Sequence, residues 1–282
     1  MRIHTNLYLI STLLSLIFLP AFLQAQTKSV TVSNAQELIA AIGPNTKITL
    51  EEGTYNLSTV IDQENKYIEW VDEYDGGAPV ISNLSNLTLT GNGKVEIVIE
   101  SQYSWVMSFK NCSNLSFYNL TVGHTEKGYC LGGCFSFDSG ENIEVTNCDL
   151  YGSGTEGVHL ESVTGFTFLS SRIRECSYYL TQIFNSSDVL FKKSTLEKTE
   201  EFNLIGVFGS NDVTFCKCII QENKTGSDFM PYLFDIDEES FDILLEKSKV
   251  LNNQTGMFIN DPSRLNLKKN VFSGNSFRDR KD

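Results

Sequence analysis

The sequence predicts an all-β fold, a right-handed parallel β-helix (solenoid) of about eight coils with a short N-terminal capping helix. From residue 82 onward, a pattern of apolar, any, apolar and then a polar or small pair recurs. The first residues of its copies are Leu87, Leu115, Ile143, Phe166, Val189, Val213, Ile243 and Leu265. Four of the seven spacings are 22 to 24 residues. A second short alternating segment precedes most copies, and no helical period intervenes, which indicates two or three short strands per coil.

The N-terminal 25 residues have the features of a secretory signal. Arg2 and His4 supply the basic start, residues 7–19 are apolar, and Ala25 is the small residue at the expected cleavage point. The apolar run is shorter than the about 20 residues of a membrane-spanning helix. We therefore expect a signal peptide at 1–25, no membrane span, and a single domain at 26–282 that is secreted, periplasmic or on the cell surface.

The two ends of the predicted solenoid differ. Residues 33–42 predict an amphipathic helix with a capping box from Ser33 to Gln36, followed by a strand at 47–57. This N-terminal cap, at about 30–60, would cover the first of the coils at about 82–275. The C-terminal end offers no matching cap, so its last coil is expected to be frayed or covered by a protein partner.

One column of positions predicts the inside of a corner. Five residues after the pattern starts, the residues are mostly small or polar: Leu120, Cys148, Ser171, Ser194, Cys218, Ser248 and Asn270. Cys148 and Cys218 are expected to act there as small buried residues. Four residues after the pattern starts, Lys193, Lys217, Lys247 and Lys269 predict a basic outer corner that either keeps the surface soluble or binds a sulfated or uronate chain.

A resemblance to a known family follows from the stretches "VTVSNAQELIAAI", "KITLEEGTYNLS" and "LSNLTLTGNG" and the repeated coils. Together they resemble the pectin-lyase-like superfamily over nearly all of residues 28–275, and more narrowly an uncharacterised group of secreted β-helix proteins. The resemblance implies the right-handed β-helix and an extracellular polysaccharide ligand or substrate. The hydrolase signatures of such proteins, Asn-Thr-Asp, Asp-Asp, Gly-His-Gly and Arg-Ile-Lys, do not occur in this sequence.

The composition excludes some partners. The formal net charge of −13 at pH 7 repels nucleic acid and anionic membranes at long range, and it disfavours polyanionic sugars unless calcium or a basic patch intervenes. No cofactor and no metal ligand set is predicted, although calcium stays possible.

The strongest candidate site centres on His159. The alternation predicts that Ser108, Ser136, His159, Gln182, Gly206, Asp235 and Phe258 face outward in one column. Glu156 and Glu161 lie near His159 in sequence, and a histidine beside carboxylates can serve as a general base. The alternative is a solvated surface histidine among acids. Ser136 and Gln182 are the expected ligand-binding neighbours.

Two loops supply further candidates. The segment 123–137 reads as an enlarged connection, and His124, Glu126 and Tyr129 are expected to overhang the groove that His159 faces. A disulfide between Cys130 and Cys134 and a metal site remain alternatives for this loop. In the insertion at 65–80, Trp70 and Tyr74 either stack on sugar rings or pack the loop onto the first coil.

Three functions are consistent with these observations. The leading hypothesis is a secreted β-helix protein that binds polysaccharide, with no catalysis evident. The alternatives are a polysaccharide lyase or glycoside hydrolase acting around His159, and a structural or adhesive module with a protein partner at the C-terminal end.

Overall fold

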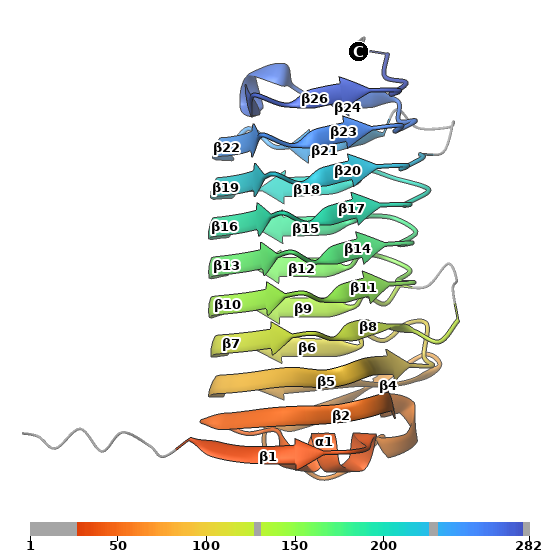
Figure 1. Cartoon of the computed structure of the whole chain (residues 1–282), viewed down its shortest axis with the longest axis vertical. Coiled ribbons are helices and arrows are strands. Elements are labelled where there is room, and N and C mark those ends of the chain that lie inside the picture. The colour runs from red at the N-terminus through yellow and green to blue at the C-terminus, as the bar shows by residue number, and fades with distance from the viewer. Residues whose placement is uncertain (1–26, 127–130, 226–230, 279–282) are drawn as a thin grey trace, which may run out of the picture.

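The molecule is a parallel β-solenoid, as predicted. The computed structural model describes residues 27–126, 131–225 and 231–278. Its chain winds through about eight turns, and two sheets run along the long axis (Figure 1). No helix within these ranges is long and apolar enough to cross a membrane.

The larger sheet has seventeen strands and contains two strands of nearly every coil, separated by a bend. Before the bend lie β7 (Ser113–Tyr118), β10 (Glu141–Thr146), β13 (Thr164–Leu169), β16 (Ser187–Lys192), β19 (Asn211–Cys216), β22 (Phe241–Glu246) and β25 (Asn266–Lys268). After it lie β8 (Thr121–His124), β11 (Asp149–Tyr151), β14 (Arg172–Arg174), β17 (Thr195–Glu197), β20 (Ile219–Gln221), β23 (Lys249–Leu251) and β26 (Val271–Ser273). At the N-terminal end, β1 (Lys28–Val32), β2 (Thr46–Asn56) and β5 (Ser85–Ile99) complete the sheet, and β5 pairs with both β7 and β8.

The smaller sheet has nine strands and lies behind the larger one in Figure 1. In spatial order these are β24 (Met257–Ile259), β21 (Tyr232–Ile236), β18 (Ile205–Phe208), β15 (Thr181–Phe184), β12 (Val158–Glu161), β9 (Phe135–Asp138), β6 (Met107–Lys110), β4 (Gly76–Ser82) and β3 (Ile68–Glu73). Strands β3 and β4 form an antiparallel hairpin, whereas the other pairs are parallel. This hairpin forms much of the segment 65–80, which the sequence analysis identified only as an insertion.

The coils turn at corners where the backbone is left-handed. The bend in the larger sheet places one such residue in each coil, with φ between 49° and 58°; we call this set the bend column: Asn119, Asn147, Ser170, Lys193, Lys217, Lys247 and Lys269. Asparagine tolerates this conformation better than most residues. The Asn147 side-chain amide also donates to the side-chain oxygen of Asn119 at 2.7 Å. The N-terminal coils thus use a residue suited to the turn, and the C-terminal coils use lysine.

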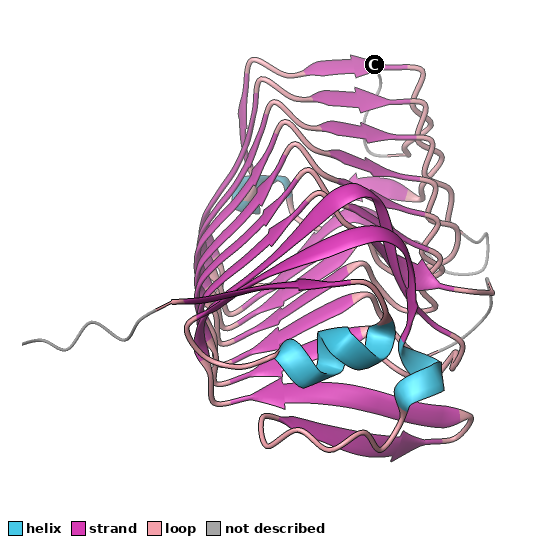
Figure 2. Cartoon of the chain, turned by 60° about the horizontal axis from the view of Figure 1, so that its bottom comes forward, coloured by secondary structure: helices cyan, strands magenta, loops and turns pink. Residues whose placement is uncertain are grey.

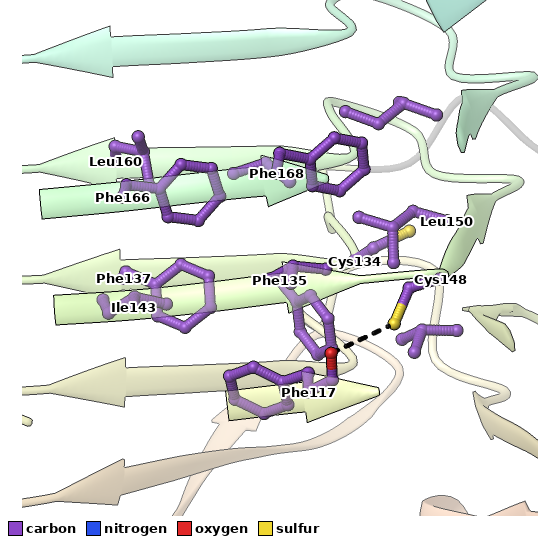
Figure 3. Close-up of a cluster of buried hydrophobic side chains, with 14 of the residues drawn as sticks. Phe117, Cys134, Phe135, Phe137, Ile143, Cys148, Leu150, Leu160, Phe166 and Phe168 are labelled. Carbon is purple, nitrogen blue, oxygen red and sulfur yellow. Dashed lines mark hydrogen bonds between the residues drawn. The ribbon is translucent and has the colours of Figure 1, made fainter. Parts of the chain in front are cut away.

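The interior is filled by stacked apolar columns. Phe117, Phe135, Phe137 and Phe166 are fully buried, and the centroids of neighbouring rings lie 5.0–5.9 Å apart (Figure 3). The predicted small column is confirmed from Leu120 to Ser248: these side chains are buried at the corner. Here the Cys148 thiol donates to the Phe117 carbonyl, and the Ser171 hydroxyl accepts from the Cys148 backbone N–H at 3.0 Å. The backbone N–H groups of Cys148, Ser171 and Cys218 each donate to the hydroxyl of the next coil, so a small side chain with an acceptor suits this corner.

The N-terminal end is closed by a helix, as predicted. Helix α1 (Ala35–Ala41) lies across the first coil with the short 3-10 helix at Leu57–Val60 beside it (Figure 2). The predicted cap residue was wrong by one position. Asn34, not Ser33, caps the helix by accepting from the Glu37 N–H, and the Glu37 carboxylate accepts from the Ser33 N–H.

Among the described residues, no α-helix covers the last coil at the C-terminal end. Leu267 and Val271 in the last coil are 41% and 52% exposed, and the second 3-10 helix, Pro262–Arg264, does not cover them. The prediction that Phe258 faces outward was wrong. Position 258 aligns with buried Leu233, because Tyr232 pairs with Met257, and its ring packs against Phe234.

Candidate functional site

The outer face of the smaller sheet brings His159 and Glu156 together. His159 projects from β12, and its Nδ1 lies 3.0 Å from Oε1 of Glu156, which sits in the turn just before that strand. The Glu156 side chain is 4% exposed and the His159 side chain 24%. The second Glu156 oxygen, Oε2, is buried without a hydrogen-bond partner. The carboxylate therefore lies beneath the imidazole, whose outer edge remains accessible.

The surroundings of the pair raise the pKa of both groups, for different reasons. Burial alone would lower the pKa of His159, but the hydrogen bond to Glu156 and the charges of Glu156, Glu161 and Asp138 outweigh burial, so this pKa is raised. Burial raises the pKa of Glu156 and outweighs the opposing effect of His159. A histidine held this way is protonated over a wider pH range than a free one, and Nε2 is the nitrogen left for a ligand.

Aromatic rings flank His159 along the sheet. The Trp105 ring lies 5.8 Å from the imidazole, the Phe184 ring lies 5.5 Å from it on the other side, and Phe208 stacks on Phe184 at 4.8 Å. All four side chains are half-buried. We call Trp105, His159, Phe184 and Phe208 the aromatic row. Sequence reasoning missed the row, although Phe184 and Phe208 occupy the same column as Glu161, one coil apart.

Hydrogen-bonding groups border the aromatic row. Ser136 and Gln182 stand in register on either side of His159, as predicted. Glu161 accepts from the Asn185 side chain at 2.9 Å, and Asp138 forms an ion pair with Lys110 at 3.5 Å. The face thus offers flat apolar rings beside carboxylates and amides, which are the groups that contact sugar rings and their hydroxyls.

Comparison with known proteins identifies the family. A family model described as "Right handed beta helix region" matches residues 82–278. The chain belongs to this right-handed β-helix family. No curated protein matches the sequence.

Solved structures of β-helix proteins share the fold at low identity. A polygalacturonase from Erwinia carotovora ssp. carotovora superposes with a TM-score of 0.62 at 10% identity, covering 91% of this chain and 82% of that one. A pectate lyase superposes with a TM-score of 0.55 at 14% identity, covering 90% of this chain and 78% of that one. The A-module of a mannuronan C-5 epimerase from Azotobacter vinelandii superposes with a TM-score of 0.52 at 13% identity, covering 86% of this chain and 74% of that one. These superpositions show that the chain shares the pectin-lyase-like β-helix fold, and they show the fold alone.

His124, the last residue of β8, does not lie at the site around His159. The expectation that His124 overhangs the groove was wrong, because its side chain is buried and its Nε2 lies 2.9 Å from the Ser104 carbonyl oxygen. Burial lowers the pKa of His124. Glu126 is exposed, whereas Tyr129 and Cys130 lie outside the described residues. Cys134 is buried in the core, at the position level with Gly157 of the next coil.

The hairpin β3–β4 separates Trp70 from Tyr74. Trp70 is half-buried, packs against the core, and its indole N–H donates to the Gln63 carbonyl at 3.2 Å. Tyr74 is 89% exposed and its ring lies 5.3 Å from that of Tyr103. Within the described ranges, no group of three or more histidine, cysteine, aspartate or glutamate side chains could hold a metal ion.

Proposed function

We propose that this protein binds a polysaccharide along the outer face of the smaller sheet, over the aromatic row. The observation that carries the proposal is the unbroken sequence of half-exposed rings from Trp105 through His159 to Phe208, crossing neighbouring coils. Sugar rings stack on such faces, and a linear chain of them would follow the solenoid axis. The named activities of the similar structures, a polygalacturonase and a pectate lyase, support a polysaccharide as the ligand class.

The proposal includes an exported protein that begins near Gln26, from which residues 1–25 have been removed. Binding is measured by calorimetry on that chain with polygalacturonate, alginate and neutral glucans. Replacing Phe184 or Phe208 by alanine removes one stacking ring, so each should weaken binding about 2- to 10-fold. Tyr118→Ala removes a half-buried ring from the other sheet and is the matched control. Equal affinity of the Phe184→Ala, Phe208→Ala and wild-type proteins would show that the row is not the binding surface.

A catalytic function is the second candidate, and the His159–Glu156 pair favours it. A buried carboxylate on Nδ1 fixes the imidazole and leaves Nε2 free on the outer face of the sheet, where the neutral imidazole could accept a proton from a uronate ring. The same polysaccharides are incubated with protein and monitored for unsaturated products by ultraviolet absorbance and for new reducing ends. Product formation that His159→Ala abolishes would establish a lyase or hydrolase. No product from any of them would leave binding as the function.

A further inference from the structure

The bend column presents a row of lysines on the other sheet, away from the aromatic row. Lys193, Lys217, Lys247 and Lys269 are all exposed. They come from four successive coils: the Lys193 N–H donates to the Cys216 carbonyl, the Lys217 N–H to that of Glu246, and the Lys247 N–H to that of Lys268, at 2.8–3.0 Å. The spacing of stacked strands places their Cα atoms about 4.8 Å apart. We call these four residues the lysine row.

The lysine row is unfavourable for the folded chain in two ways. Each lysine adopts a φ of 50–57°, a conformation that asparagine, used at the same corner in earlier coils, accommodates better. Like charges stacked on adjacent strands also repel one another. At another left-handed corner the successive residues are Gly152, Glu175, Lys198, Glu222 and Asn252, so charge alternates there. Solubility alone does not require a run of one sign.

Neighbouring residues strengthen the positive charge. Lys192, Lys249 and Lys268 lie on the strands that flank the bend. Glu246 forms an ion pair with Lys247 at 3.4 Å and offsets only part of this charge. The whole chain has a formal net charge of −13. The lysine row is therefore a local basic patch on an acidic molecule.

A groove extends the lysine row toward the N-terminal coils. Its volume is about 410 Å3, and it runs along the bend past Asn119, Asn147 and Ser170. Its charged lining comes from Lys94, Arg172 and Lys193 and from Asp149, whose carboxylate forms an ion pair with Arg174 at 3.0 Å. Arg172 also forms an ion pair with Glu197, which leaves its side chain 42% exposed. The groove and the lysine row share Lys193 and form one continuous track.

We propose that this track binds an anionic polysaccharide, one that carries a carboxylate or sulfate on successive sugars. A charge on each sugar recurs at a length similar to the coil spacing, so a glycan lying along the axis can meet one lysine per coil. Nucleic acid is disfavoured because the acidic remainder of the surface repels a polyanion of such charge density. This surface is separate from the aromatic row and does not depend on it.

The test uses the change Lys→Asn at positions 193, 217 and 247 together. Asparagine suits the left-handed corner, so the triple variant should melt at the same temperature as the wild type or higher. Dextran sulfate and polygalacturonate serve as probes, with neutral dextran as the reference. Loss of three exposed ion pairs should weaken binding of the charged probes about 10- to 100-fold, and added salt should weaken wild-type binding.

A matched control distinguishes the effect of the lysine row from the effect of a more negative net charge. The change Lys→Asn at positions 28, 47 and 198 removes three exposed lysines elsewhere, one of them also at a left-handed corner. This control should bind the charged probes like the wild type. The proposal is overturned if the wild type does not bind the charged probes, if both triple variants lose affinity equally, or if a DNA duplex binds the row more tightly than the glycans.

Discussion

Asn147 provides the sharpest test of how the corners hold the coils. Its φ is 54° and its side-chain amide donates to Asn119 at 2.7 Å. Asn147→Ala loses about 1 kcal/mol of hydrogen bonding and adds about 1–2 kcal/mol for a left-handed residue with no local polar group, so it should destabilise by about 2–3 kcal/mol. Asn147→Gly loses the same hydrogen bond. It also loses about 0.4–1 kcal/mol of stability because glycine makes the unfolded chain more flexible, but glycine has no steric penalty in the left-handed conformation.

The glycine variant should therefore be more stable than the alanine variant, by about 1 kcal/mol in free energy of unfolding or about 2–4 °C in melting temperature. The assay is thermal unfolding followed by far-ultraviolet circular dichroism. Thr167, in the regular strand β13, is the control: there alanine should be better than glycine. An alanine variant at 147 that melts at or above the glycine variant would refute the reasoning about left-handed corners.

Three further outcomes are expected. Phe137→Ala, in the middle of the ring stack, should cost about 3–5 kcal/mol in urea unfolding, and a loss below 1 kcal/mol would contradict tight packing there. Ser171→Ala leaves the buried Cys148 N–H without its acceptor and should cost about 1–3 kcal/mol; wild-type stability would mean another group replaces the hydroxyl. The free energy of unfolding should fall as pH rises from about 6.5 through the raised pKa of folded His159, because the folded state holds the proton more tightly than the unfolded state. His159→Gln should make this dependence on pH less steep. If the variant shows the same dependence as the wild type, other groups cause it.

The coil architecture could be predicted because each coil repeats the same inward and outward alternation. The small column at Cys148 and Ser171 was likewise visible, since its spacing follows the repeat. The hairpin β3–β4 was missed because it occurs only once in the described residues, so it produces no repeating pattern in the sequence. Phe258 was misplaced because the sequence comparison set it level with Asp235, whereas the pairing of Tyr232 with Met257 sets it level with the buried Leu233.

The candidate site was only partly predictable. The sequence indicated His159 with Glu156, three residues apart, but not that Glu156 would be buried beneath the ring. Trp105 and Phe184 reach the imidazole from loops and strands of other coils, so their contact required the stacked geometry. His124 was misassigned because a histidine in a glycine-rich segment suggests exposure, whereas its strand turns it toward the Ser104 carbonyl.

The closed N-terminal end has a consequence for how the chain folds. Parallel sheets usually fold slowly, because partners far apart in sequence must meet. Here the sealed end is synthesised first, and β10, β13 and β16 each pair with a strand that ended fewer than thirty residues earlier. We therefore expect each new coil to meet a template that has already formed, and assembly to proceed by local addition from the N-terminal end.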